Sequence, residues 1–504
     1  MTCRTASALA LLLSLCAAPL AATAATAATA SVDATAPMSE AGRAFQAEVG
    51  QAVQQGQRGD SLGASIMFER LLADPRLAAL GADDRSDVWA AAAMVAAEQK
   101  DFALTTRRLQ QALSINPHNA YAHLRLAWFQ LFDGQPTAAA DSVIRGAAAS
   151  KDSPDITNEV VWQLEGELKD QPGKRMALLQ ALFDKGWKND GVEPVELWVV
   201  LATLQVEQGH GDQVPATLER IDAPIALVRL RSDKRFDRYL ARDDARYDPV
   251  AAARRQIDRL RVETMLRPGL NDTAVELATA LMVAGELGDV VGMTDRLSAV
   301  ANAATDPPGQ EATAVAWMLD TRSRALRRQG ESDRAVGNQL LAVRMGGADA
   351  VSQKLNLAAL YMALHRPMLA REVLRGVEGG MSVHGASTHA LVSLMTARQL
   401  KDDAAARQAW TVLQANRGQT PGHYRDALIA DDRMDEAAQA LIAQLADPME
   451  RGQVLLELQD MRTGPVLEGE QAFHARWKQM EQRADVRAAI DQIGRIDSYP
   501  LFSY

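Results

Sequence analysis

Residues 86–119 read SDVWAAAAMVAAEQKDFALTTRRLQQALSINPHN, and this stretch decides the fold class. Trp89, Ala92 and Ala96 recur at the spacing of a single helical face, and a second helical run follows a short polar break. Pro117 then ends the second run, because proline cannot continue a helix. The small alanine side chains allow two helices to approach closely. The stretch therefore predicts an antiparallel helical hairpin.

The same layout returns along the chain at intervals of about 34 residues, which indicates a repeat architecture. The next copy begins at Ala120 and has its polar break at Asp133, Gly134 and Gln135. Further copies begin at Ala274, Ala316, Val351 and Ser387, and weaker ones begin near Phe45, Asn158, Leu197 and Gly418. A succession of stacked hairpins is therefore expected over most of the chain.

This layout resembles the tetratricopeptide repeat, a helix–turn–helix unit of about 34 residues that often closes with a proline. In the first copy Trp89 stands at the aromatic position, and Ala92-Ala93 stands at the Leu-Gly pair of the family. In the copy from Val351, Tyr361 stands at the family's tyrosine. The resemblance implies an all-α, right-handed solenoid of antiparallel helix hairpins, arranged as one array or as two arrays joined by an irregular helical segment.

The domain organisation follows from where the repeats stop. The repeat is lost from about residue 223 to residue 269, and between residues 229 and 267 twelve Lys or Arg stand against seven Asp or Glu. This basic stretch is interpreted as a hinge or as a helical insertion between two arrays, with a long helix beginning near Pro249. The expected domains are a signal peptide at 1–24, a flexible low-complexity tether at 25–38, an N-terminal array at 39–222, the basic insertion at 223–270, a C-terminal array at 271–447 and a helical C-terminal cap at 448–504.

The first residues predict export. Arg4 precedes a short apolar run, and small residues follow it up to a cleavage site after Ala24, which is the order of a secretory signal peptide. The expected location is therefore periplasmic or secreted. Both cysteines, Cys3 and Cys16, lie in this signal. Cys16 leaves open a lipoprotein signal, which the large Leu15 before it disfavours. No later stretch is apolar enough to span a bilayer as a helix of about 20 residues.

Composition and charge exclude several classes of function. Apolar residues make up 47% and charged residues 23% of the 504 residues, as in ordinary folded proteins. The formal net charge is −10, which disfavours nucleic acid as a partner. The chain has no Gly-rich phosphate loop, no G-x-S-x-G and no H-E-x-x-H. We therefore expect no cofactor, no metal site and no enzymatic activity.

The resemblance also implies a binding groove lined by the first helix of each hairpin. In the N-terminal array the family's groove offsets fall on apolar and aromatic residues suited to a peptide. In the C-terminal array they fall on arginines, whose planar forks suit carboxylates, phosphates or sulfates. The predicted protein-binding residues are Met94, Tyr121, Leu124, Trp128, Phe132, Arg324, Arg327, Arg328 and Arg398. Packing between hairpins for the aromatics, and a solvated charged face for the arginines, are the alternatives.

The sequence thus predicts a non-enzymatic scaffold of a bacterial envelope that binds a protein or peptide partner in its groove. One alternative is an accessory factor of a polysaccharide-export or outer-membrane assembly complex, with an acidic polymer or protein at the Arg-rich regions. A second alternative is an enzyme with an unrecognised site, for which the sequence offers no candidate residues.

Overall fold

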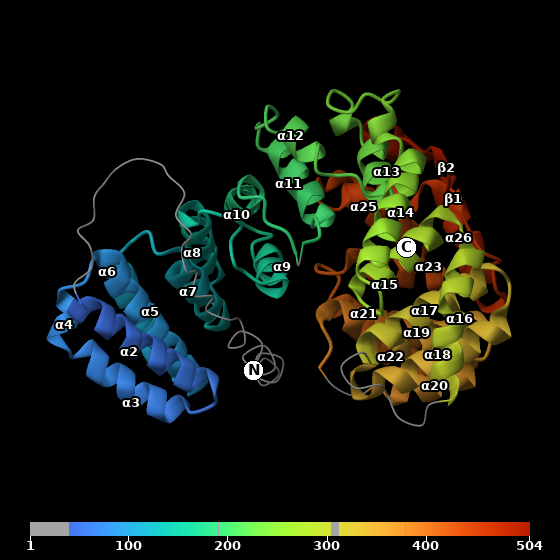
Figure 1. The fold of residues 1–504 in the computed structure, drawn as a ribbon. Helices are drawn as coiled ribbons and strands as arrows, with labels where there is room; N and C mark the ends of the chain where they lie inside the picture. Colours follow the sequence, from blue (N-terminus) through green and yellow to red (C-terminus); the bar gives the residue numbers. More distant parts are fainter. Residues whose placement is uncertain (1–39, 190, 304–311, 378–379, 504) are drawn as a thin grey trace. The chain divides into compact units, whose positions relative to one another are not determined.

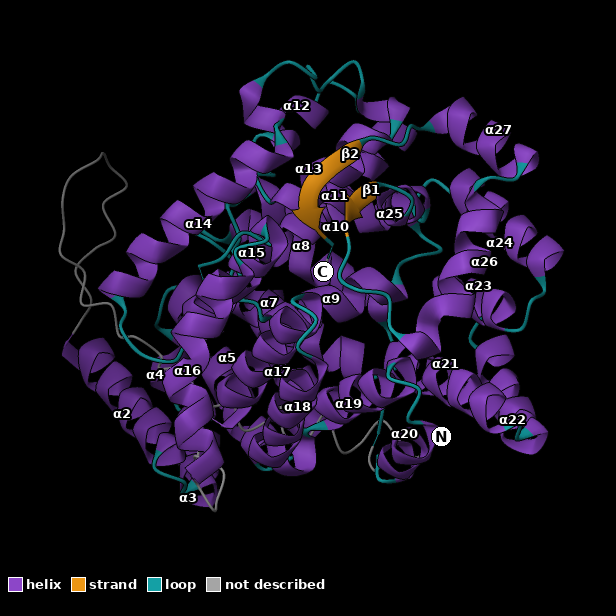
Figure 2. Cartoon of the chain, turned by 90° about the vertical axis from the view of Figure 1, so that its right-hand side faces the viewer, coloured by secondary structure: helices purple, strands orange, loops and turns teal. Residues whose placement is uncertain are grey.

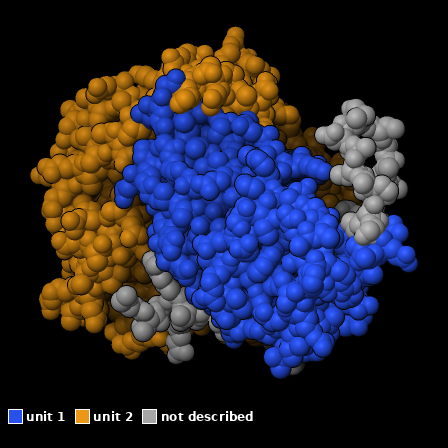
Figure 3. Space-filling view, turned by 90° about the vertical axis from the view of Figure 1, so that its left-hand side faces the viewer, with its two compact units in different colours: residues 1–209 blue, residues 210–504 orange. Residues whose placement is uncertain are grey.

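A computed structural model describes residues 40–189, 191–303, 312–377 and 380–503. The chain forms two compact units, residues 1–209 and residues 210–504, which are coloured separately in Figure 3. The predicted signal peptide and tether lie outside the described residues. The division falls after Gly209, whereas the predicted first array extends to residue 222. Each unit is described by itself below.

Unit 1 is built from the helical hairpins that the repeat pattern predicts (Figure 1). The hairpin expected in residues 86–119 is confirmed by two helices that flank a turn at Lys100. Both Leu109 and Ala112 of the second helix are fully buried. The helices of this unit are α2 (Glu40–Gln57), α3 (Ser61–Leu72), α4 (Pro75–Ala78), α5 (Ala82–Glu98), α6 (Phe102–Ile115), α7 (Ala120–Phe132), α8 (Pro136–Ala149), α9 (Asn158–Glu167), α10 (Pro172–Asp184) and α11 (Val195–Glu207).

A left-handed residue marks the turn between the two helices of successive hairpins. Lys100 has φ 63°, and Gly134 has φ 74° at the same place in the next hairpin. Directly after Lys100, the Asp101 side chain accepts a hydrogen bond from the Leu104 N–H at 2.9 Å and so begins the second helix. The corresponding turns of unit 2 contain Gly285, Gly330, His365, Lys401 and Asp432, all with positive φ. The same left-handed turn therefore recurs between the paired helices of hairpins in both units.

Unit 2 continues the hairpins after two helices of the predicted insertion. The long helix expected near Pro249 is confirmed as α14, which begins at this proline. Tyr361, placed at the family's tyrosine, is buried in the core between hairpins. The helices up to residue 446 are α12 (Val214–Leu218), α13 (Pro224–Ser232), α14 (Pro249–Leu266), α15 (Asp272–Ala284), α16 (Leu287–Ala303), α17 (Ala312–Arg328), α18 (Ser332–Gly346), α19 (Val351–Ala363), α20 (Pro367–Arg375), α21 (Val383–Leu400), α22 (Asp403–Ala415), α23 (Pro421–Ala430) and α24 (Met434–Ala446).

The C-terminal segment, defined as residues 460–503, does more than cover the last hairpin. Its helices pack on α24 through Met480, Val486 and Ile490, as a terminal cap does. Its two strands, β1 and β2, pair in parallel and lie side by side in Figure 2. The elements from residue 451 on are α25 (Arg451–Glu457), β1 (Asp460–Arg462), the 3-10 turn η5 (Glu468–Glu470), α26 (Gln471–Glu481), α27 (Ala484–Ile493) and β2 (Ser498–Phe502).

The end of the C-terminal segment returns to the first helices of unit 2. Tyr499 and Leu501 of β2 share one apolar core with Val228 of α13 and Val283 of α15. Nearby, the Arg495 guanidinium donates to both carboxylate oxygens of Asp237 at 2.7 and 2.5 Å. The two ends of unit 2 are therefore joined by apolar packing and by an ion pair.

Basic residues of the insertion have partners within unit 2. Arg242 pairs with Asp497 of the C-terminal segment at 2.7 Å, and Arg235 pairs with Asp233 at 2.5 Å. These carboxylates offset part of the positive charge that the sequence shows between residues 229 and 267. Among the described residues, no helix is long and apolar enough to cross a membrane.

Candidate functional site

The candidate site lies in unit 2, where the C-terminal segment passes the ends of successive first helices. Glu470 pairs with Arg327 at the end of α17 at 2.5 Å. The Gln399 side chain, near the end of α21, donates to the carbonyl oxygens of Met362 and Gly469 at 3.0 and 3.4 Å. Further along, Arg476 of α26 donates to carbonyl oxygens at the end of α23. One segment thus contacts the ends of the first helices α17, α19, α21 and α23.

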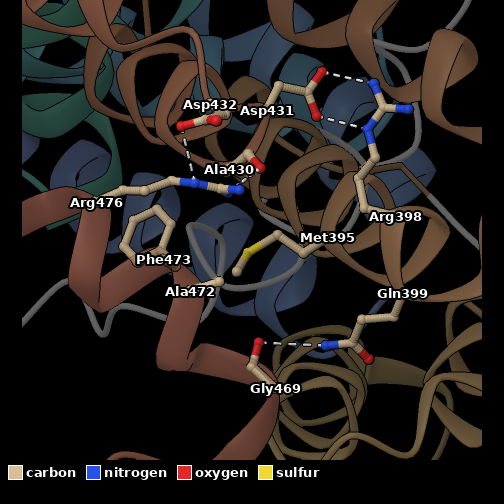
Figure 4. Close-up of a pocket in the computed structure, with 10 residues that line it drawn as sticks. All are labelled: Met395, Arg398, Gln399, Ala430, Asp431, Asp432, Gly469, Ala472, Phe473 and Arg476. Carbon is tan, nitrogen blue, oxygen red and sulfur yellow. Dashed lines mark hydrogen bonds and ion pairs between the residues drawn. The ribbon is translucent and has the colours of Figure 1, made fainter.

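A pocket of about 400 Å³ opens between this segment and the ends of α21 and α23 (Figure 4). Carbonyl groups, two carboxylates and two guanidinium groups face it together with the apolar side chains of Met395 and Phe473. The lining residues are Met395, Arg398, Gln399, Ala430, Asp431, Asp432, Gly469, Ala472, Phe473 and Arg476. Of the nine predicted binding residues, only Arg398 is among them.

Arg398 is held by carboxylates of its own chain. Its Nε and Nη2 atoms donate to the two oxygens of Asp431 at 2.6 and 2.7 Å, and Nη1 donates to Asp403 at 3.0 Å. Burial raises the pKa of Asp431, but hydrogen bonds from Arg398 and Trp410 outweigh it and leave that pKa below its usual value. The hydrogen bond to Asp431 raises the pKa of Arg398. The two parallel hydrogen bonds that Arg398 could donate to a ligand carboxylate are therefore already made to Asp431 of the same chain.

The second guanidinium group of the pocket, that of Arg476, also has partners within the chain. Arg476 Nε lies 3.2 Å from a carboxylate oxygen of Asp432, and its Nη1 donates to the carbonyl oxygen of Ala430 at 2.8 Å. Each arginine of the pocket thus faces one aspartate. An anion that entered this pocket would have to displace these carboxylates, so the pocket of Figure 4 is a weak candidate for anion binding.

The arginine cluster of α17, defined as Arg324, Arg327 and Arg328, has fewer carboxylate partners than the arginines of the pocket. Arg327 is neutralised by Glu470, but within the described part of the chain neither Arg324 nor Arg328 forms an ion pair. Arg328 Nη2 donates to the Ser503 carbonyl oxygen at 2.6 Å, and its guanidinium lies 4.6 Å from the ring centre of Phe502. Burial, with its positive neighbours, lowers the pKa of Arg328 to about 10. Arg328 therefore keeps its positive charge at neutral pH.

Packing within unit 1 buries some of the apolar residues that were predicted to bind a partner. Leu124 and Trp128 are 5% and 8% exposed. The Trp128 ring is stacked on Phe132 at 5.7 Å between centroids and meets Phe129 edge-on at 4.8 Å. Phe132 is 39% exposed, while Met94 and Tyr121 are half-buried. Whether these side chains bind a partner stays a prediction.

An exposed tryptophan of unit 1 is missing from the sequence prediction. Trp162 is 40% exposed and is the fifth residue of α9, as Leu124 is the fifth residue of α7. It therefore occupies the family's groove offset in the next hairpin. The repeat near Asn158 is weak, but its predicted start coincides with the first residue of α9. Counting the groove offset from Asn158 is therefore the signal that was available.

The match to a protein-family profile agrees with the repeat architecture. The profile of the tetratricopeptide repeat family matches residues 96–158, a stretch from the end of α5 to the start of α9. No curated protein matches the sequence. A structure of Naa15/Naa10 bound to HypK-THB is 11% identical, with 89% of this chain and 80% of that chain covered and a TM-score of 0.28.

A second solved structure, of the APC/C hetero-tetramer Cut9-Hcn1, is 12% identical over 90% of this chain and 96% of that chain, with a TM-score of 0.26. At scores this low, neither structure carries an argument about this chain. Tetratricopeptide repeats indicate a protein-interaction scaffold. The matched profile places a tetratricopeptide repeat at residues 96–158, and the recurring left-handed turns and the succession of antiparallel hairpins fit the all-α solenoid that such repeats form.

Proposed function

We propose that this chain is an interaction scaffold that binds an acidic segment of a partner protein at the arginine cluster of α17. The observation that carries the proposal is the unneutralised charge of Arg324 and Arg328, which stand on a protein whose net charge is −10. Within the chain itself, the carboxylate of Glu470 in the C-terminal segment already pairs with Arg327 of this cluster. A partner carboxylate next to Arg324 would make the same kind of contact.

The chemistry favours an extended acidic peptide. Arginine forks bind carboxylates with two parallel hydrogen bonds, and half-buried guanidinium groups are screened less by salt than exposed ones. An acidic polysaccharide would offer the same carboxylates, and it is the alternative ligand for an accessory factor of polysaccharide export. The two are separated by testing an oligoglutamate peptide and an acidic polysaccharide side by side.

Reversing the charge of Arg324 is the most direct test. Because Arg324 has no hydrogen bond or ion pair within the described residues, the change Arg324→Glu removes charge without breaking a visible contact. We expect binding of oligoglutamate, measured by fluorescence anisotropy, to weaken more than tenfold at low salt and less at high salt. The exposed Arg407 of α22 supplies the control, since Arg407→Glu makes the same change of charge. Equal losses in the two variants would contradict the proposed site.

We also propose that the protein works in the cell envelope of a bacterium. Support comes from the order of Arg4, the apolar run and the small residues before Ala25. We expect the protein recovered from an envelope fraction to begin near Ala25 when its N-terminus is sequenced. Recovery of an acylated Cys16 would establish the lipoprotein alternative, and an intact Met1 on protein from the cytoplasm would overturn export.

A further inference from the structure

A second pocket of unit 2, of about 520 Å³, has no part in the site described above. It lies between the second helices α20 and α22 and has α21 as its floor; the three helices are found in Figure 1. It shares no lining residue with the pocket of Figure 4. Its volume is in the range of about 300–1,000 Å³ that is usual for small-molecule sites.

The lengths of the helices explain why this trough exists. The second helix α20 has 9 residues, whereas the second helices on either side, α18 and α22, have 15 and 13. The short helix leaves part of α21 uncovered. Small side chains then leave the space open, since Ala390 and Ala397 of α21 and Ala405 and Ala409 of α22 all line it. The interior is therefore mostly apolar.

One wall of the trough carries two cations without an acidic partner. Arg371 and Arg375 are one turn apart on α20 and both line the pocket. Arg371 Nη2 lies 3.2 Å from the sulfur of Met368, and within the described residues neither arginine forms an ion pair. Asp402 is the carboxylate that lines the trough, and its Oδ1 atom accepts the Ala405 N–H at 3.0 Å as the cap of α22. The guanidinium charges therefore remain available to an incoming anion.

A buried hydroxyl in the same pocket also lacks a partner. Thr396 of α21 is 2% exposed, and its Oγ1 atom forms no hydrogen bond. A threonine inside a helix usually donates to the carbonyl four residues earlier. Buried polar groups are rarely left unpaired in native proteins, and each exception calls for an explanation. A ligand oxygen in the trough would supply the missing partner.

We propose that this trough binds a single-chain amphiphile with a carboxylate head, of the class of the fatty acids. The alkyl chain lies against the alanine-lined floor, where burying apolar surface is favourable. The carboxylate pairs with the guanidinium groups of Arg371 and Arg375 and accepts a hydrogen bond from the Thr396 hydroxyl. This activity goes beyond the scaffold function, because it uses the second helices rather than the arginine cluster of α17.

The test uses the full chain and two probes with the same alkyl length, decanoate and decan-1-ol, titrated calorimetrically below the micelle concentration of decanoate. We expect decanoate to bind at least tenfold more tightly than the alcohol. The double change Arg371→Gln and Arg375→Gln should remove this preference, while Arg407→Gln on α22 should keep it. Equal binding of the two probes, or no binding of decanoate at millimolar concentration, would overturn the proposal.

Two further variants locate the ligand and keep the test independent of folding. Thr396→Val removes only the unpartnered hydroxyl, so we expect an unchanged or raised melting temperature together with a severalfold loss of decanoate affinity. The half-buried Ala405 lines the trough, and Ala405→Phe should fill it and abolish binding of both probes. Undiminished decanoate binding in a folded Ala405→Phe protein would place the ligand elsewhere.

Discussion

Replacing Arg425 with methionine will destabilise unit 2 by about 3–5 kcal/mol, because it leaves half-buried carboxylates without their partner. The Arg425 side chain is 2% exposed. Its Nη2 atom donates to both Asp426 and Glu457 at 2.8 Å, and its Nη1 atom donates to Gln444 at 3.2 Å. The guanidinium also lies 4.7 Å from the ring centre of Trp477. One side chain thus connects α23, α24, α25 and α26.

Hydrogen exchange of amides in α23 and α24 measures this loss separately from the unfolding of unit 1. Arg407→Met on α22 is the control, because an exposed arginine contributes little and we expect a change within about 0.5 kcal/mol. Adding Asp426→Asn and Glu457→Gln to Arg425→Met should restore part of the stability, since no buried charge then stays unpaired. A loss under about 1 kcal/mol for Arg425→Met would show that the network is not needed for stability.

The repeat architecture could be predicted from the sequence because its signals are local. The helical period of Trp89, Ala92 and Ala96, and the polar break before the second helix, lie within one hairpin of about 34 residues. The left-handed turn at Lys100 returns as Gly134 in the next hairpin, and this regularity is visible as spacing. The confirmed predictions therefore concern helices and turns whose sequence signals lie within a single hairpin and do not depend on distant residues.

The path of the C-terminal segment depends on distant residues, and no local signal reveals it. Arg495 and Asp237, which join the two ends of unit 2, are 258 positions apart. The three-residue strand β1 is too short to show an alternating pattern. For the same reason the sequence does not show which of the predicted binding residues already have partners within the chain. The sequence shows Arg398 as an arginine at a groove offset, but it cannot show that Asp431, which follows the end of α23, already holds its guanidinium.

Gly469→Ala will lift the C-terminal segment from the ends of α19 and α21. A Cβ atom at this position would overlap the carbonyl oxygen of Met362 and would lie 3.0 Å from that of Ala363 and 2.7 Å from Gln399 Nε2. The two carbonyl groups belong to the end of a packed helix and cannot move aside easily. We expect a loss of about 3 kcal/mol or more, at the upper end of the range for overpacking a rigid site.

Hydrogen exchange in peptides that cover residues 463–476 measures the detachment, and we expect protection there to fall more than tenfold. Gly337 of α18 supplies the control, because nothing lies within 4 Å of a Cβ at that position. Gly337→Ala should leave the protection of the segment unchanged and should stabilise α18 slightly, since alanine favours helix more than glycine. Unchanged protection in Gly469→Ala would show that the segment tolerates the extra atom.

The same variant also connects the C-terminal segment to the proposed function. When residues 463–476 detach, Glu470 leaves Arg327, and none of the three arginines of the α17 cluster then has an acidic partner among the described residues. Because an internal carboxylate then no longer competes, we expect oligoglutamate to bind Gly469→Ala severalfold more tightly than the unchanged protein at low salt. Adding Arg324→Glu should cancel this gain. A detached segment with unchanged affinity would mean that the arginine cluster is not where acidic peptides bind.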